Sequence, residues 1–280
     1  MNIETIVDEM MFIEAPRWRG EHLWFSDMHD ETVYRLKPGE ALQAIATVPH
    51  SPSGLGWLPN GDLLISSMAD RKIMRLSADG ELGEHADVSH IAKFHINDMI
   101  TDSRGRAWVG NFGFLFGQGG SPRATKLARI DPDGSTHIAA DDLMFPNGMV
   151  VTPDGRTLIV AETFAHKLTA FDVAESGDLS NRRDWANLEG LNPDGICLDQ
   201  SGAIWIASPT DHAFLRVREG GEILQRIPIG RQAIACTLGG ADGRTLFMCS
   251  SRAVTREACR AKNSAQIDTI HVDIAGTASP

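Results

Sequence analysis

The stretch from Pro146 to Ala161 is PNGMVVTPDGRTLIVA, and it contains the unit from which most of this chain is built. Asn147 begins a short apolar run, the pair Asp154-Gly155 follows it, and a second apolar run occupies residues 158–161. Short apolar runs on either side of an Asp-Gly turn are typical of a β-hairpin. We therefore predict two adjacent antiparallel strands in this stretch.

The same unit recurs along the chain, and we call the residue that begins each copy its anchor position. The six anchor positions are occupied by Glu14, Ser53, Asn97, Asn147, Asp194 and Ala235. In five copies a turn glycine follows the anchor by eight residues, as Gly155 follows Asn147. The first copy is shorter at its turn, so Glu14 is aligned through Trp18, which matches Trp57.

The spacing of the anchor positions indicates the architecture. Successive anchors lie 39, 44, 50, 47 and 41 residues apart, and each copy also contains a third alternating run, such as 33–36. Repeats of this length with several strands each are typical of a propeller. We predict an all-β fold: a six-bladed β-propeller of one domain, residues 1–280, with four antiparallel strands per blade. Ile3, Thr5 and Val7 alternate, so we expect the N-terminal strand to close the last blade.

Composition limits the partners. The 37 acidic and 26 basic residues give a net charge of −11, which argues against nucleic acid and anionic membranes and leaves a small-molecule substrate. The N-terminus has no secretory pattern and no run reaches transmembrane length. The four cysteines have no metal-like spacing. We expect a reduced, cytoplasmic protein, and the sequence leaves its oligomeric state open.

Four anchor positions carry oxygen donors: Glu14, Asn97, Asn147 and Asp194. The first strands of propeller blades line the central axis, so equivalent positions form a ring at one end of the channel. Two carboxylates and two amides suit a hard cation such as Ca²⁺, Mg²⁺ or Mn²⁺ better than a structural zinc. Each Asn or Asp alone could be an ordinary turn residue. Four in register favour a metal site, because facing buried carboxylates need a cation or shared protons.

These motifs resemble those of the regucalcin / gluconolactonase / luciferin-regenerating-enzyme family. The resemblance is carried by EAPRW at residues 14–18, Asn97-Asp98, PNG at residues 146–148 and PDG at residues 193–195, and it covers nearly the whole chain. It implies a six-bladed propeller that holds one divalent cation on its axis. Ca²⁺ is the commonest ion in the family, with Zn²⁺, Mn²⁺, Mg²⁺ and Fe²⁺ as alternatives.

The resemblance also implies roles for individual residues. It identifies Glu14, Asn147 and Asp194 as metal ligands, and Asn97 as a residue that contacts substrate, metal-bound water or the metal itself. The implied activity is lactone hydrolysis, in which the metal polarises the carbonyl. Asp194 is the catalytic candidate for activating water, although the cation could activate water without it.

Two departures from the family pattern bear on the substrate. Sugar lactonases of the family carry an Arg where this chain has His95, and an acidic residue in the third-blade loop, which here has none. That loop instead contains Phe112, Phe114 and Phe116. We predict that His95, Phe112 and Phe114 contact a substrate less polar than a sugar lactone. The alternatives are that the Phe side chains pack under their own loop and that His95 is structural.

Other functions remain open at this stage. The same metal could serve phosphotriester hydrolysis, or a lyase or aldolase step on a chelated carbonyl, or it could be purely structural in a binding scaffold. Asp27, Asn111 and Glu162 end second strands and are weaker candidates for the cavity. The basic loop at residues 251–262 could attract an anionic group. The sequence contains no phosphate-binding loop, nucleophile elbow or HExxH motif.

Overall fold

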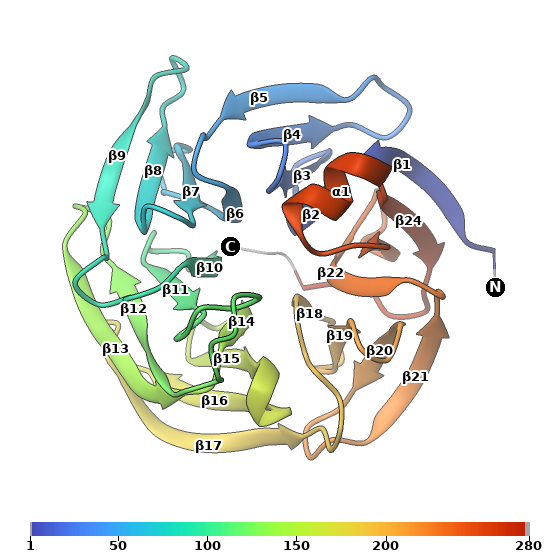
Figure 1. Ribbon diagram of the computed structural model, residues 1–280. Helices are drawn as coiled ribbons and strands as arrows, with labels where there is room; N and C mark the ends of the chain where they lie inside the picture. The colour runs from blue at the N-terminus through green and yellow to red at the C-terminus, as the bar shows by residue number, and fades with distance from the viewer. Residues whose placement is uncertain (1, 278–280) are drawn as a thin grey trace.

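The computed structural model describes residues 2–277, which form six four-stranded antiparallel sheets around a central axis (Figure 1). The predicted all-β, six-bladed propeller is confirmed. Residue 1 and residues 278–280, which the predicted single domain includes, lie outside the described part.

In five blades the strands follow chain order from the axis to the rim, and in the last blade the N-terminal strand is outermost (Figure 1). The innermost strands are β2 (Ile13–Arg19), β6 (Pro52–Trp57), β10 (Ile96–Thr101), β14 (Pro146–Val151), β18 (Ile196–Leu198) and β22 (Gln232–Gly239). The second strands are β3 (His22–Asp27), β7 (Leu63–Ser67), β11 (Ala107–Asn111), β15 (Thr157–Glu162), β19 (Ile204–Ser208) and β23 (Thr245–Ser251).

The third and fourth strands of each blade, counted from the axis, are more exposed to solvent than the first and second. The third strands, which the alternating runs predicted, are β4 (Thr32–Leu36), β8 (Lys72–Leu76), β12 (Thr125–Ile130), β16 (Lys167–Val173), β20 (Ala213–Val217) and β24 (Ala265–His271). The rim strands are β1 (Glu4–Met10), β5 (Gln43–Thr47), β9 (Leu82–Asp87), β13 (Thr136–Leu143), β17 (Leu179–Asn187) and β21 (Ile223–Pro228).

The ring is closed by the N-terminal strand, as predicted. β1 pairs antiparallel with β24, with Glu4 opposite Thr269 and Thr5 opposite Asp268. The last blade therefore combines the two ends of the strand order, β22–β24 and β1. This pairing covers the edge that β24 would otherwise expose.

Neighbouring innermost strands approach each other too closely for side chains at some positions. A Cβ on Gly54 would lie 2.2 Å from the backbone nitrogen of Met99 in the next blade. A Cβ on Gly148 would lie 2.5 Å from the carbonyl oxygen of Asp194. Glycine at these two positions lets the inner strands converge, and this convergence brings the anchor positions of different blades together.

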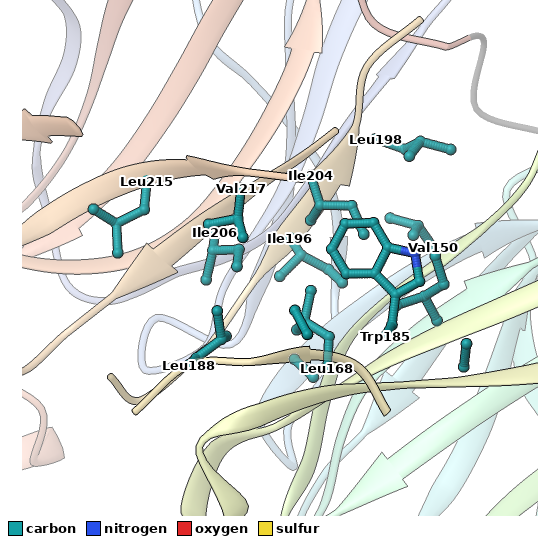
Figure 2. Packing of buried hydrophobic residues seen from close by; sticks show 14 of the residues in the cluster. Val150, Leu168, Trp185, Leu188, Ile196, Leu198, Ile204, Ile206, Leu215 and Val217 are labelled. Carbon is teal, nitrogen blue, oxygen red and sulfur yellow. The ribbon is translucent and has the colours of Figure 1, made fainter. Parts of the chain in front are cut away.

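The hydrophobic core lies largely between adjacent blades. Between the fourth and fifth blades, Trp185 of β17 packs among Val150, Leu168 and Ile196 (Figure 2). The core continues through Ile204 and the other buried residues of this cluster. Because each sheet buries both faces against its neighbours, the blades form a rigid support for the residues at the axis.

In the described part of the chain, helical structure is confined to two short segments, η1 (Thr163–Ala165) and α1 (Arg256–Lys262). Thr255 caps α1 by accepting a hydrogen bond from the backbone nitrogen of Ala258. Within residues 2–277, no helix is long and apolar enough to cross a membrane.

Candidate metal and substrate site

The anchor positions coincide with irregularities in the innermost strands. Strand pairing shifts register between Glu14 and Arg17, and again between Ile96 and Met99 and between Pro146 and Met149. In the fifth blade Asp194 precedes β18, and its backbone nitrogen donates to the carbonyl of Ala207 at 2.9 Å. A bulge frees a residue from regular pairing and redirects its side chain, which allows the anchor side chains to face the axis.

Glu14 and Asp194 lie close enough to influence each other's ionisation, although they belong to the first and fifth blades. Burial raises the pKa of Glu14 well above its usual value, and the carboxylates of Asp194 and Asp98 raise it further. Burial raises the pKa of Asp194 to about 8, against a lowering by the amide of Asn147. Glu14 and Asn147 are therefore each near enough to Asp194 to interact with its carboxylate.

Several polar atoms at this end of the axis have no protein partner. Oδ1 of Asp194, Nδ2 of Asn97 and Oγ of Ser53 are buried without a hydrogen bond, whereas Asp194 as a whole keeps some accessible surface. An orphaned buried carboxylate oxygen is costly unless a cation or a proton occupies the space beside it. A half-turn of the Asn97 amide would place its oxygen where Nδ2 lies. These donors fit a hard, oxygen-preferring cation.

The donor set is poorer in carboxylates than many metal sites. Among residues 2–277, no three His, Cys, Asp or Glu side chains form a group able to hold a metal ion. A cation at the anchor positions would depend on two carboxylates completed by amide oxygens. Nδ2 of Asn147 donates to Oγ1 of Thr163 at 3.2 Å, which fixes the orientation of that amide.

A buried ion pair lies directly below the anchor positions. Nη2 of Arg17 in the first blade donates to Oδ1 of Asp98 at 2.7 Å and to the carbonyl of Met99 at 2.6 Å, both in the third blade. Asp98 therefore points to Arg17 and not to the anchor residues. Arg17 is a residue that the sequence analysis missed, although it lies within the quoted EAPRW motif.

Beyond Arg17 the axis continues as a cavity lined mostly by apolar residues, with Arg17, Thr237 and Thr277 as polar ones. Its lining includes Arg17, Ile100, Val150, Cys197 and Leu238, with Thr277 at the opposite end from the anchor positions. Arg17 therefore lies between the anchor residue Glu14 of its own strand and this cavity.

Five phenylalanines form a cluster at the channel mouth, and we call Phe112, Phe114, Phe116, Phe145 and Phe164 the Phe cluster. Phe112 stacks on Phe145 with ring centroids 4.6 Å apart, and Phe145 meets Phe164 edge-on at 5.1 Å. Phe114 is 4 % exposed, whereas Phe116 is 42 % exposed. The loop phenylalanines therefore pack against the fourth blade, rather than only under their own loop.

The Phe cluster is joined to the anchor positions through Phe145. This residue directly precedes Pro146-Asn147 and has a φ of +59°, a strained value for a bulky side chain. Such strain is retained where surrounding structure enforces it, and it occurs often at functional sites. Phe145 and Phe164 were not predicted from the sequence to lie near the substrate, because neither belongs to the third-blade loop.

A second apolar group packs against Phe112. Phe12, Met28, Met68, Ile234 and Cys259 are buried together, with Phe112 packed against them. Cys259 belongs to α1, so the loop predicted only as basic contributes to this apolar group.

His95 lies at the mouth beside the third-blade loop. Its imidazole is exposed, with its centroid 5.7 Å from that of Phe112, and its carbonyl accepts a hydrogen bond from the Phe112 nitrogen at 2.9 Å. Partial desolvation lowers the pKa of His95, and Arg71 lowers it further, which favours the neutral imidazole. The structure thus places His95 with Phe112, two residues before Asn97.

The weaker candidates at the ends of second strands hold loops in place. Asp27 accepts hydrogen bonds from the backbone nitrogens of Met11 and Phe12 at 2.8 and 2.9 Å. Asn111 accepts from Oγ1 of Thr125 at 2.7 Å. Glu162 accepts from the nitrogen of Met144 at 2.7 Å and pairs with Arg182. Their polar atoms are engaged in bracing the mouth.

Comparison with known proteins identifies the class. Residues 12–252 match the family model described as SMP-30/Gluconolactonase/LRE-like region, and the chain belongs to this family. A curated relative, 6-deoxy-6-sulfogluconolactonase of Pseudomonas putida, is 28% identical over 247 residues, covering 85% of this chain and 83% of the relative. Regucalcin of Xenopus laevis is 31% identical over 264 residues, covering 90% and 87%.

The fold is also shared with solved structures. A calcium-binding protein, regucalcin from Agrobacterium tumefaciens, superposes with a TM-score of 0.81 at 20% identity, covering 98% of this chain and 95% of that one. The family suggested by the four sequence motifs is thereby confirmed.

Proposed function

We propose that this protein is a divalent-metal-dependent hydrolase of a cyclic ester. The observation that carries the proposal is the convergence of Glu14 and Asp194 from separate blades, with Oδ1 of Asp194 buried and unpartnered. A relative named 6-deoxy-6-sulfogluconolactonase supports lactone hydrolysis as the reaction class, and the structurally similar calcium-binding regucalcin supports a divalent cation.

Glu14, Asn147 and Asp194 would hold the cation, with Asn97 as a further ligand or as a contact to substrate. Oxygen donors alone favour Ca²⁺, with Mg²⁺, Mn²⁺, Zn²⁺ or Fe²⁺ as alternatives. When bound, a cation of this kind polarises a lactone carbonyl and acidifies water.

Asp194 is the residue best suited to move a proton. It is the anchor carboxylate that combines partial accessibility with a free oxygen. The water oxygen forms a bond to the carbonyl carbon, and Asp194 accepts the proton that this water releases. The bond from the carbonyl carbon to the ring oxygen then breaks, and the proton passes to that oxygen to give a hydroxy acid.

The mouth suits a substrate with an apolar part. A sugar lactone presents several hydroxyl groups, and each one left unpaired in a closed site costs about 1–3 kcal/mol. Phe112 and Phe116 belong to a loop that offers aromatic faces, Phe114 packs beneath Phe116, and His95 offers an imidazole. Burial of an apolar ring against these faces would contribute roughly 1.5–3 kcal/mol. We therefore assign a substrate less polar than gluconolactone.

A lactone panel tests the proposal. Aldonolactones, alkyl lactones and aromatic lactones are compared with metal-stripped protein and with the same protein reloaded with Ca²⁺, Mg²⁺, Mn²⁺ or Zn²⁺. We expect turnover that is lost on stripping and restored by a divalent ion. Undiminished turnover in protein shown to contain no metal would overturn the metal-dependent mechanism. If the protein hydrolysed phosphotriesters and none of the lactones, the reaction class would be phosphotriester hydrolysis instead.

A further inference from the structure

Two cysteines from adjacent blades face each other in the cavity beyond Arg17. Sγ of Cys197 in β18 lies 3.8 Å from Sγ of Cys236 in β22. The two residues are 39 positions apart in sequence, so only the fold brings them together. Both line the cavity beyond Arg17, on the side away from the anchor positions.

The pair differs from the other cysteines in surroundings and access. Cys249 and Cys259 are fully buried, and neither has a sulfur neighbour among the hydrogen bonds of the described chain. Cys236 is also buried, but Cys197 keeps part of its surface accessible to the cavity. A small oxidant in the cavity can therefore reach Cys197 first, with Cys236 positioned behind it.

We propose that Cys197 and Cys236 form a reversible thiol modification site, in which a peroxide converts the facing thiols to a disulfide between the fifth and sixth blades. The inference is independent of lactone hydrolysis, because it uses neither the anchor positions nor the Phe cluster.

The reaction needs a peroxide as oxidant and proceeds in two steps. The Cys197 thiolate attacks one peroxide oxygen, the O–O bond breaks, and a sulfenic acid and hydroxide form. Sγ of Cys236, on losing its proton, then attacks Sγ of Cys197 and displaces hydroxide. Two thiols and hydrogen peroxide thus give one disulfide and two waters. The sulfurs must close from 3.8 Å to about 2.05 Å, which small side-chain and backbone movements can supply.

The surroundings influence the rate of the first step. Burial raises the pKa of Cys197 well above the ordinary value, and the neighbouring Cys236 raises it further, whereas the guanidinium of Arg17 lowers it. Arg17 lines the same cavity and is the cation available to a thiolate there. We therefore expect slow oxidation by dilute peroxide, on a scale of minutes to hours.

A disulfide here would join the two blades beside Asp194. Sγ of Cys236 lies 3.8 Å from the carbonyl oxygen of Gly195, and the Gly195 nitrogen donates to the carbonyl of Ile234 at 2.9 Å. A covalent bridge would restrict separation of the blades at this seam, so the oxidised protein should unfold at a higher temperature. For a loop of this length we expect Tm to rise by several degrees.

Peptide mapping of the folded full-length protein tests the site. The protein is treated with hydrogen peroxide, remaining thiols are alkylated under denaturing conditions, and proteolytic peptides are analysed by mass spectrometry. We expect a linked pair of peptides containing Cys197 and Cys236, loss of two of the four free thiols, and full reversal by dithiothreitol. The Cys259→Ser variant serves as the matched control and should form the same link.

Single variants separate the two steps. In Cys236→Ala the link should disappear, and dimedone should trap a sulfenic acid on Cys197. In Cys197→Ser the peroxide-dependent loss of two thiols should also disappear. The mapping of the unmodified protein does not depend on either variant folding well. The proposal is overturned if peroxide oxidises Cys249 or Cys259 while Cys197 and Cys236 stay reduced, or if the only link formed joins two chains.

Discussion

Arg17 crosses the propeller axis from the first blade to Asp98 in the third, where Nη2 and Oδ1 are 2.7 Å apart. Both side chains are less than 10 % exposed, at 9 % and 4 %. Asp98 is also one of the carboxylates that raise the pKa of Glu14, whereas Arg17 lowers it. The pair thus serves as the floor of the candidate site and as part of its electrostatic environment.

Removal of Arg17 should destabilise the protein strongly. Arg17→Met leaves Asp98 as a buried carboxylate without its cation, a change that costs roughly 3–5 kcal/mol in comparable buried pairs. The double variant Arg17→Met with Asp98→Asn removes both charges and should recover part of this loss. Urea denaturation of the metal-free proteins measures both values. Equal stability of the single variant and the unchanged protein would show that the pair contributes little.

The repeat allowed the fold to be predicted in detail. Anchor spacing and the Asp-Gly turns predicted six blades, and the alternation of Ile3, Thr5 and Val7 predicted the closing strand, because strand alternation and turn chemistry are local properties. The register of the anchor positions also predicted that Glu14, Asn147 and Asp194 form one metal site, and this stays a prediction. Because the anchor positions are equivalent in the repeat, residues far apart in sequence could be predicted to lie at the same end of the axis.

The mouth was predicted less completely, for a physical reason. The Phe cluster combines the third-blade loop with Phe145 and Phe164 of the fourth blade, and packing between loops has no sequence period. The long side chain of Arg17 and the pairing of Cys197 with Cys236 likewise depend on side-chain directions near the axis. A repeat locates a strand, but it does not show which neighbouring side chains touch.

Loss of an anchor carboxylate should weaken metal binding. Asp194→Ala and Glu14→Gln each remove negative charge that would offset a divalent cation, and we expect at least a tenfold loss of affinity and most of the turnover. Isothermal titration with Ca²⁺ and Mn²⁺ measures the affinity without reference to activity. Asp141→Asn, an exposed position on β13, changes the net charge equally and should bind as the unchanged protein does. Retained affinity in both anchor variants would place the cation elsewhere.

The stability of the metal-free protein should fall as pH rises from about 4 to about 8. The pKa of Asp194 is raised from 3.8 to about 8, so the folded chain keeps this proton over a range where the unfolded chain has lost it. More protons bound in the folded state means that the free energy of unfolding decreases with increasing pH. Glu14 contributes in the same direction.

Thermal unfolding of metal-stripped protein at several pH values checks this prediction. Asp194→Asn has no proton to lose at that position, so its Tm should depend less on pH over the same range. Bound divalent metal should also flatten the profile, because it replaces the protons. A metal-free protein that becomes more stable across this range would contradict the raised pKa.

Substrate preference provides the last prediction and concerns the Phe cluster. We expect kcat/KM to be higher for an apolar or aromatic lactone than for gluconolactone, because the mouth offers aromatic faces and few polar partners for sugar hydroxyls. Phe116 is 42 % exposed on the third-blade loop, so Phe116→Ala removes a ring that a substrate can reach with little loss of core packing. It should narrow the preference several-fold. Leu115→Ala, at a neighbouring position that is 50 % exposed, is the matched control.

Phe114→Ala should narrow the preference as well, but with lower stability, because Phe114 is buried against Phe164 with centroids 5.6 Å apart. A full panel with gluconolactone as the best substrate would refute the apolar assignment, and it would leave the metal site as proposed.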